Sequence, residues 1–205
     1  MDRHEHWDRV YRRNAASAVS WYQPDATLSL NLIRRVTSDR GAAIVDVGGG
    51  ASTLVDGLLD AGYRNLTVLD LSGSALAVAQ RRLAARAREV SWVEGDVLTE
   101  PFAPSSFAVW HDRAVFHFLT DARDRTAYVE AARRAIRPGG HVIVASFAID
   151  GPTRCSGLEV VRYSPEAMHS QFGSDFRLLD SVREEHHTPS GAMQPFVYCL
   201  CRVGG

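Results

Sequence analysis

The sequence contains no lysine, so all 23 of its basic residues are arginine. This absence excludes each mechanism that needs a lysine amine, including a Schiff base, a pyridoxal phosphate anchor and the lysine of a phosphate-binding loop. The charges are also balanced, because 24 acidic residues leave a formal net charge of -1. A nearly neutral chain creates no long-range field for nucleic acid or an anionic membrane, so we expect neither as a partner.

Cysteine and long apolar runs are equally scarce. The three cysteines, Cys155, Cys199 and Cys201, are an odd number without paired spacing, which argues against a secreted disulfide framework and predicts a cytoplasmic protein. No stretch approaches the ~20 apolar residues of a membrane span, and the N-terminal residues show no apolar segment of the signal type. His186 and His187 form half of a metal site that no ligand cluster completes, so we expect no metal.

What the chain does have is a regular alternation of helix-like and strand-like segments. Its 205 residues, 45% of them hydrophobic, suffice for one domain over residues 1–205. The alternation predicts an α/β fold, a mostly parallel sheet with helices on both faces. We expect strands at 43–47, 65–69, 90–93, 107–111, 141–147, 176–185 and 196–203. We expect helices at 25–39, 51–61, 73–88, 122–136 and 165–171. The short loop 186–191 predicts an antiparallel hairpin, and hence a reversed last strand.

The stretch from Ile44 to Ser52 is the most informative one. An apolar run with an embedded acid, Asp46, breaks into three consecutive glycines that open a helix. Glycines let the backbone approach a ligand closely, and the first amides of the helix offer free donors. A dinucleotide fingerprint would need a further glycine where Thr53 stands, so that pattern is not met. A carboxylate just before the turn suits a ligand that carries an ammonium group.

Two more acids follow the next two expected strands. Asp70 ends the second strand, where an acid can accept both hydroxyls of a ribose, and Asp96 follows the third. Each acid alone could cap a helix or a turn. Three acids at three successive strand ends are hard to obtain from capping needs alone.

With these motifs, nearly all of the chain resembles the class I S-adenosylmethionine-dependent methyltransferases. The resemblance implies a Rossmann-like, doubly wound sheet of seven strands with a reversed last strand, and S-adenosylmethionine as the cofactor. It also implies that Asp46 and the glycines face the methionine part, that Asp70 binds the ribose, and that Leu71, Asp96 and Val97 surround the adenine. The expected cofactor-binding residues are Asp46, Gly48, Gly49, Gly50, Ser52, Asp70, Leu71, Ser72, Asp96, Val97, His111 and Trp21. The family usually has glycine where Ser52 stands, and that hydroxyl can also cap the helix.

The acceptor is expected beyond the fourth strand, at the segment 110–119. His111 and Asp112 are the candidate catalytic residues, with His111 as a general base. The alternatives are that His111 packs on the cofactor, that Asp112 caps a helix, and that His117, on the same short helix starting at Asp112, is a core histidine. Family members that methylate amide or adenine nitrogens carry Asp/Asn-Pro-Pro-aromatic here, and this chain does not. The expected acceptor is a small molecule, with a thiol, another soft nucleophile or a carboxylate, or a protein side chain.

The segment before the first strand is expected to cover the site. Residues 1–40 would form a helical lid over a core of residues 41–205. Trp21 and Tyr22 are expected to close over the cofactor, whereas Trp7 and Tyr11 are expected to pack in the core. Two other functions stay open, an NAD-dependent oxidoreductase and a non-catalytic S-adenosylmethionine-binding regulatory protein. No feature of the sequence specifies an oligomeric state.

Overall fold

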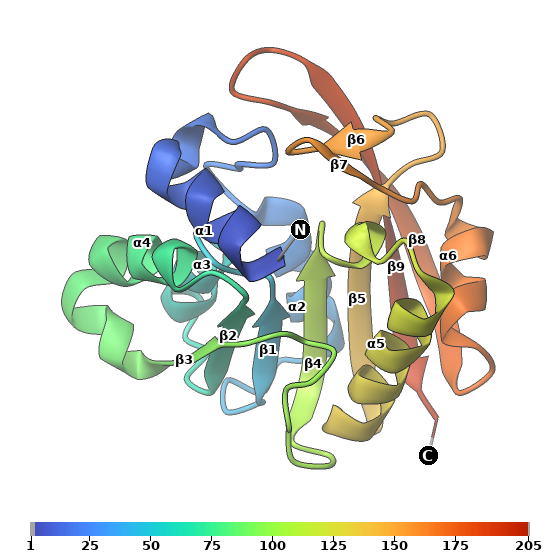
Figure 1. Cartoon of the computed structure of the whole chain (residues 1–205). Helices are drawn as coiled ribbons and strands as arrows, with labels where there is room; N and C mark the ends of the chain where they lie inside the picture. Colours follow the sequence, from blue (N-terminus) through green and yellow to red (C-terminus); the bar gives the residue numbers. More distant parts are fainter. Residues whose placement is uncertain (1–2, 205) are drawn as a thin grey trace.

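A single seven-stranded sheet organises the computed structural model, which describes residues 3–204 (Figure 1). Residues 1 and 2, the start of the predicted lid, lie outside the described residues. The strand order is β3-β2-β1-β4-β5-β9-β8. The strands are β1 (Ile44–Val47), β2 (Leu66–Asp70), β3 (Val90–Glu94), β4 (Phe107–Arg113), β5 (Ile136–Phe147), β8 (Phe176–His187) and β9 (Met193–Val203). Strands β1 to β5 pair in parallel, while β9 is antiparallel to both β5 and β8. This confirms the predicted α/β class and the reversed last strand.

Helices cover both faces of the sheet and bury two separate apolar clusters. The helices are α2 (Thr27–Val36), α3 (Leu54–Asp60) and α4 (Gly73–Leu83) on one face, and α5 (Ala122–Ala135) and α6 (Pro165–Phe172) on the other. Side chains of a strand alternate between faces, so Ile44 packs in the first cluster while Val45 and Val47 pack in the second. All of β1, and β4 up to Asp112, are buried. A polar side chain in either strand is therefore inside the protein.

The N-terminal segment lies over the carboxyl ends of the first strands. Helix α1 (Arg3–Arg13) and the short 3-10 helix η1 (Ala16–Ala18) precede α2, and Figure 1 shows α1 above the ends of β1 and β2. Asp8 anchors α1 to the start of α4. Its Oδ1 accepts from Ser72 Oγ at 2.6 Å and from the Ser74 amide at 3.3 Å. The charge-assisted bonds to Asp8 hold its pKa below the usual range and fix α1 in place.

The structure corrects the short helix expected from Asp112. Strand β4 continues to Arg113 instead, the backbone turns at Ala114 with φ of 72°, and the 3-10 helix η3 (Phe116–Phe118) follows. The prediction failed because the polar run after Trp110 masks a strand that is buried on both faces, where apolar alternation is not required.

Other boundaries differ by shorter segments. The helix expected over 73–88 ends at Leu83 and continues as the 3-10 helix η2 (Ala84–Glu89). Strand β5 begins at Ile136 rather than at residue 141. The hairpin loop spans 188–192, so His186 and His187 belong to β8. A small hairpin, β6 (Arg154–Cys155) and β7 (Leu158–Glu159), occupies a stretch for which no strand was expected.

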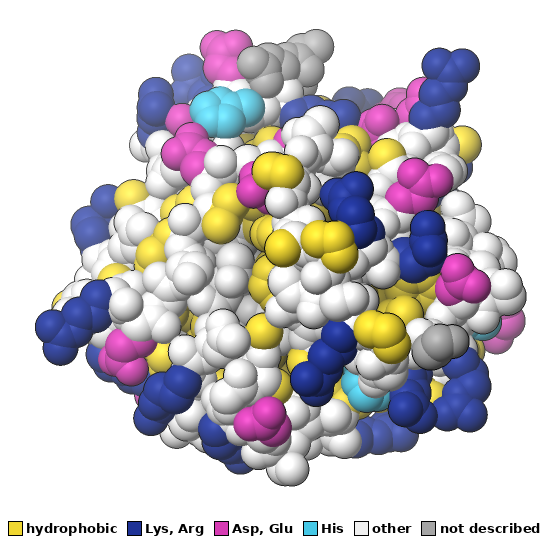
Figure 2. Space-filling model, turned by 90° about the horizontal axis from the view of Figure 1, so that it is seen from below, with side chains coloured by type: hydrophobic (Ala, Val, Ile, Leu, Met, Phe, Trp, Pro, Cys, Tyr) yellow, Lys and Arg dark blue, Asp and Glu magenta, His cyan; other side chains and the backbone are white. Residues whose placement is uncertain are grey.

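Several surface arginines form ion pairs with nearby acids. Arg183 binds both oxygens of Asp150, at 2.9 and 2.8 Å, and exposed pairs of this kind contribute little stability. On the face seen in Figure 2, arginines are spread among acidic and hydrophobic side chains rather than gathered in one patch. Among residues 3–204, no helix is long and apolar enough to span a membrane.

Candidate functional site

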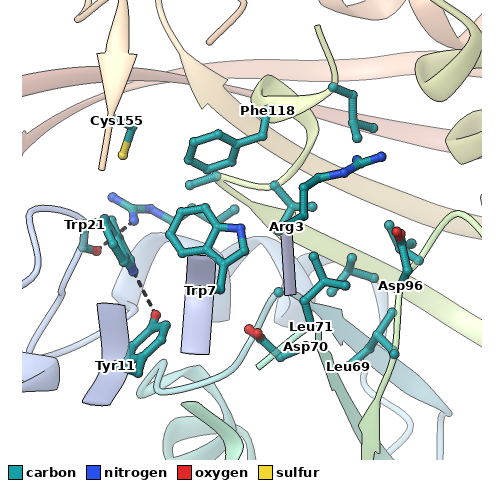
Figure 3. A pocket seen from close by; sticks show the side chains of 18 residues that line it. Arg3, Trp7, Tyr11, Trp21, Leu69, Asp70, Leu71, Asp96, Phe118 and Cys155 are labelled. Carbon is teal, nitrogen blue, oxygen red and sulfur yellow. Dashed lines mark hydrogen bonds between the residues drawn. The ribbon is translucent and has the colours of Figure 1, made fainter. Parts of the chain in front are cut away.

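Two neighbouring cavities lie at the carboxyl edge of the sheet. We call the first the polar cavity, because Asp46, Ser29 and His111 line it. We call the second the aromatic cavity, shown in Figure 3, because Trp7 and Phe118 line it together with Asp70 and Asp96. The lining residues that both share are Tyr11, Trp21, Gly48 and Arg113. The two cavities therefore meet at these four residues, which we call the junction.

The glycine turn forms the floor between the cavities. Gly48 has a φ of +67°, and a Cβ there would stand 2.0 Å from Val115 Cγ2. A Cβ on Gly50 would stand 2.5 Å from Asp70 Oδ2. Both positions therefore require glycine, the first for its backbone conformation as well as for space. The absence of a side chain at Gly50 therefore lets the Asp70 carboxylate lie against the backbone of the turn that follows β1.

The exit of the turn is held by side chains. Ser52 Oγ accepts from the Leu54 amide at 3.1 Å, so this hydroxyl caps the start of α3. Arg82 of α4 donates to the carbonyls of Ala51 at 2.9 Å and Ser52 at 2.6 Å, and it pairs with Asp56. The loop is thus fixed from outside the cavities.

Asp46 and His111 form a buried pair because the register of β1 and β4 places them side by side. Equivalent residues of paired strands point to the same face, here the face covered by α2. His111 Nδ1 lies 2.7 Å from Asp46 Oδ1, and its Nε2 lies 2.8 Å from Ser29 Oγ. Both ring nitrogens are therefore engaged. Asp46 Oδ2, in contrast, is buried and has no hydrogen-bond partner among the described residues.

Asp70 and Asp96 stand in the aromatic cavity at the ends of β2 and β3. Burial raises the pKa of Asp70 to about 7, the Ser72 amide that donates to it lowers the pKa, and the nearby charge of Asp46 adds to the rise. Asp96 Oδ1 accepts from the Leu98 amide at 2.9 Å, so this acid also shapes its turn. Figure 3 shows the two carboxylates on opposite sides of Leu71, with Asp70 on the side of Tyr11.

Asp112 points to the opposite face from His111 because neighbouring residues of a strand alternate. It is fully buried and lines neither cavity. Its oxygens accept from the amides of Val115 and Phe116, at 2.9 and 3.1 Å, and from the Tyr128 hydroxyl at 2.6 Å. Burial raises the pKa of Asp112 to about 6, and these bonds oppose the rise. This position outside both cavities does not support a catalytic role for Asp112.

Aromatic side chains from the N-terminal segment cover the aromatic cavity. Trp7 of α1 packs edge-on against Trp21, with ring centroids 5.7 Å apart, and against Phe118 at 4.9 Å. Trp21 Nε1 donates to the Tyr11 hydroxyl at 3.1 Å. Trp7 and Tyr11 thus line the cavity, whereas the sequence favoured core packing for them. Tyr22 lines the polar cavity.

Arg113, at the end of β4, is held by residues far apart in the chain. Its Nε donates to the Tyr198 hydroxyl at 2.9 Å, and its Nη1 donates to the Trp21 carbonyl at 3.0 Å. Its Nη2 pairs with Glu184 Oε2 at 3.2 Å. The guanidinium also lies 4.1 Å from the centroid of the Phe196 ring. Only 9% of the side chain is exposed, so its place at the junction is well defined.

His117 and His186 take structural places. His117 is fully buried, and burial lowers its pKa to about 3, so the ring is neutral. Its Nδ1 accepts from the Phe147 amide at 3.4 Å. His186 Nε2 donates to the Ser20 carbonyl at 2.7 Å. Among residues 3–204, no three His, Cys, Asp or Glu side chains are grouped to hold a metal ion.

Most of the residues expected to bind a cofactor are brought together. Those that line one or both cavities are Asp46, Gly48, Gly49, Ser52, Asp70, Leu71, Asp96, Val97, His111 and Trp21. Gly50 and Ser72 line neither, since Gly50 backs onto Asp70 and Ser72 caps α4 and donates to Asp8. The sequence reasoning missed Ser29. A hydroxyl one helical turn before Ile33, within the apolar stripe of the 25–39 helix, is the feature that points to it.

Comparisons with known proteins relate this chain to methyltransferases. Residues 44–140 match the family model of a methyltransferase domain. The chain is 37% identical over 111 residues, 53% of its length, to the ubiquinone/menaquinone biosynthesis C-methyltransferase UbiE of Roseobacter denitrificans. It is 28% identical over 196 residues, 94% of its length, to the eEF1A lysine and N-terminal methyltransferase of Danio rerio. The chain spans 43% and 27% of the lengths of these two relatives.

A solved structure shares the fold over almost the whole chain. It comes from work on the conversion of a disulfide bond into a thioacetal group during echinomycin biosynthesis. The TM-score is 0.79 at 20% sequence identity, and the match covers 99% of this chain and 93% of that chain.

Proposed function

Because this chain belongs to the class I S-adenosylmethionine-dependent methyltransferases, we propose that it binds S-adenosylmethionine across the two joined cavities and transfers its methyl group to an acceptor at the junction. The observation that carries the proposal is the continuity of the cavities, with Asp46 at one end and Asp70 and Asp96 at the other. These are the three acids at the ends of three successive strands in the sequence.

The residues present fit this cofactor. The buried, unpartnered Asp46 Oδ2 needs a donor, which an ammonium group supplies. Asp70, beside the glycine turn, offers carboxylate oxygens to the hydroxyls of a ribose. Leu71 and Val97 give an adenine ring apolar walls next to the hydrogen-bonding edge of Asp96. His111 and Ser29 would hold Asp46 in place rather than touch the acceptor.

When bound, S-adenosylmethionine supplies an electrophilic methyl group on a sulfonium. The chain's own contribution is alignment and exclusion of water. Trp7, Trp21 and Phe118 would exclude water from the junction, and we propose that residues 1–40 act as the lid of a core formed by residues 41–205. Asp112 would act as a positioning residue, because it holds the start of η3, the 3-10 helix that ends at Phe118, without reaching a cavity.

The acceptor class is proposed from the site. A small molecule with a thiol, another soft nucleophile or a carboxylate fits the aromatic cavity, and a protein side chain is the alternative that one relative's name suggests. An NAD-dependent oxidoreductase is disfavoured by the reversed β9 and by Thr53 at the place of the further glycine. The cytoplasmic location expected from the cysteines stays a prediction.

Calorimetric titration tests the proposal. We expect S-adenosylmethionine and its demethylated product, S-adenosylhomocysteine, to bind with a stoichiometry of one and NAD to give no heat of binding. Binding of NAD alone would contradict the proposal. Binding of the sulfur compounds without methyl transfer to any acceptor in a metabolite and peptide library would instead favour a non-catalytic regulatory protein.

A further inference from the structure

The junction identifies where an acceptor must present its nucleophile, given the proposed function on which this inference rests. If Asp46 holds one end of the cofactor and Asp70 and Asp96 the other, the atom that links the two ends lies between the cavities. The residues shared by both cavities are the ones around that point. Two of them, Tyr11 and Arg113, carry polar side chains.

No side chain at the junction is able to take a proton from an acceptor near neutral pH. Burial raises the pKa of Tyr11, and its hydroxyl already accepts from Trp21. Burial also raises the pKa of the nearby Cys155 thiol to about 11. His111 turns its two ring nitrogens to Asp46 and Ser29, and it does not line the aromatic cavity. Within residues 3–204, the acids of the aromatic cavity are the two assigned to the cofactor.

Arg113 brings donors to the same place. Each terminal nitrogen of a guanidinium carries two hydrogens. Nη1 uses one on the Trp21 carbonyl and Nη2 one on Glu184, so each retains a hydrogen without a partner among the described residues. Arg113 cannot lose its charge, and the neighbouring groups from β8 and β9, Glu184 and Tyr198, lie on the side of Nε and Nη2.

We propose that Arg113 selects an acceptor whose nucleophile is an anion, an ionised phenol, thiol or carboxylic acid on a flat apolar molecule, and that it rejects an amine. The free guanidinium hydrogens stabilise the anion by charge-assisted hydrogen bonds. Trp7, Trp21 and Phe118 provide apolar walls for the flat part. A protonated amine meets the guanidinium hydrogens of Arg113, and the four junction residues offer it no carboxylate.

The reaction then balances without a protein base. The acceptor loses its proton to solvent on ionisation, before methyl transfer. A lone pair of the anion forms the new bond to the methyl carbon, the bond from that carbon to sulfur breaks, and its electron pair stays on sulfur. The products are a neutral methyl ether, thioether or ester and a neutral sulfur compound.

Three nitro-substituted ring compounds of similar size test the selection: 4-nitrophenol, 4-nitrothiophenol and 4-nitrobenzylamine. They are titrated into protein saturated with S-adenosylhomocysteine, so binding is measured without turnover. We expect the phenol and the thiol to bind at least tenfold more tightly than the amine. We also expect the absorbance of bound 4-nitrophenol to show ionisation at a lower pH than in free solution, because Arg113 stabilises the phenolate.

Variants assign the effect to Arg113. Arg113→Gln should weaken binding of the two acids about tenfold and abolish the absorbance shift, while Arg113→Lys should retain part of both. Arg162→Gln is the matched control, since Arg162 donates to the Gly151 carbonyl and lines neither cavity. Affinity for S-adenosylhomocysteine and the circular dichroism spectrum report whether each variant is folded.

Clear outcomes separate this inference from the proposed function. Equal or tighter binding of the amine, no binding of any probe, or unchanged binding of the acids by a folded Arg113→Gln protein overturns the selection by Arg113. Methylation of a lysine-containing peptide by the unaltered protein overturns it too. Failure of the unaltered protein to bind S-adenosylhomocysteine overturns the proposed function itself, a result visible before any probe is added.

Discussion

The polar and aromatic cavities are built from different parts of the chain. The polar cavity takes its charged groups from β1 and β4, where strand register sets Asp46 against His111. The aromatic cavity takes its cover from α1 and the loop after it, and side-chain contacts hold α1 in place, such as those of Asp8 with Ser72 and Ser74. In the proposed function, the sheet would supply the polar groups that bind the cofactor and Arg113, and the added segment would supply apolar walls for the acceptor. The difference suggests a test: changes in the added segment should alter acceptor use more than cofactor binding.

The largest difference between the two cavities should appear when the tryptophans that cover the aromatic cavity are removed. We expect the double substitution Trp7→Ala/Trp21→Ala to lower kcat/KM by roughly a hundredfold, because two large apolar walls are lost and water enters the junction. Affinity for S-adenosylhomocysteine should fall less than tenfold. Trp92→Ala, which removes a tryptophan of β3 outside both cavities, serves as the control. An equal loss in both quantities would mean that the two regions are not separable.

Asp70→Ala tests the cofactor side alone. Charge-assisted hydrogen bonds are each worth ~1.5 to 3 kcal/mol, so its loss should weaken affinity for S-adenosylhomocysteine by roughly tenfold to a hundredfold in calorimetry. Asp60→Ala, at an exposed acid that pairs with Arg86, should change nothing. If the affinity stays within about twofold of the original, Asp70 does not bind the ribose and only orders the start of α4.

His111 and Asp112 are adjacent in β4, but their substitution should affect different quantities. His111→Asn should weaken cofactor binding by about threefold to tenfold, since Asp46 loses its buried partner. Asp112→Asn should leave that affinity unchanged and lower the thermal midpoint by several degrees, because three donors lose a charged acceptor. Turnover lost without any loss of cofactor affinity in His111→Asn would return this residue to an acceptor-side role.

The smallest expected effect is on pH dependence. Asp70 has a pKa of about 7, raised by burial, and its ionised form is the better acceptor for hydroxyls. Affinity for S-adenosylhomocysteine should therefore rise with pH, by up to about tenfold between about pH 6 and about pH 8. Asp70→Asn should flatten this dependence. A rise of the same size in that variant would assign the titration to another group.

The fold was predictable from the sequence because its buried strands and glycine turn leave strong local patterns. Strands β1, β2 and β3 lie within one residue of the expected bounds, and the three acids at their ends do line the cavities. Burial on both faces makes β1 and most of β2 nearly continuous apolar runs, which a sequence displays directly. The same patterns supported the fold class, which the strand order confirms.

The acceptor region was less predictable, for physical reasons. Whether Trp7 and Tyr11 pack in a core or line a cavity depends on where α1 docks, and that is decided by Asp8 and Ser72, 64 positions apart. The split between His111 and Asp112 depends on β4 continuing as a strand, which its polar residues conceal. Arg113 gains its place from Glu184 and Tyr198, on strands that are remote in sequence. Periodicity carries no information about such contacts.

Successive side chains of β4 point to opposite faces of the sheet, and this limits which mutations the strand tolerates. His111 serves a cavity, Asp112 ties down α5 through Tyr128, and Arg113 serves the cavities again. Inserting or deleting a single codon within β4 before His111 would turn each of these side chains to the wrong face, burying a guanidinium against α5 and aiming the carboxylate at α2. Relatives should therefore accumulate substitutions in this strand, while length changes stay confined to the loops on either side of it.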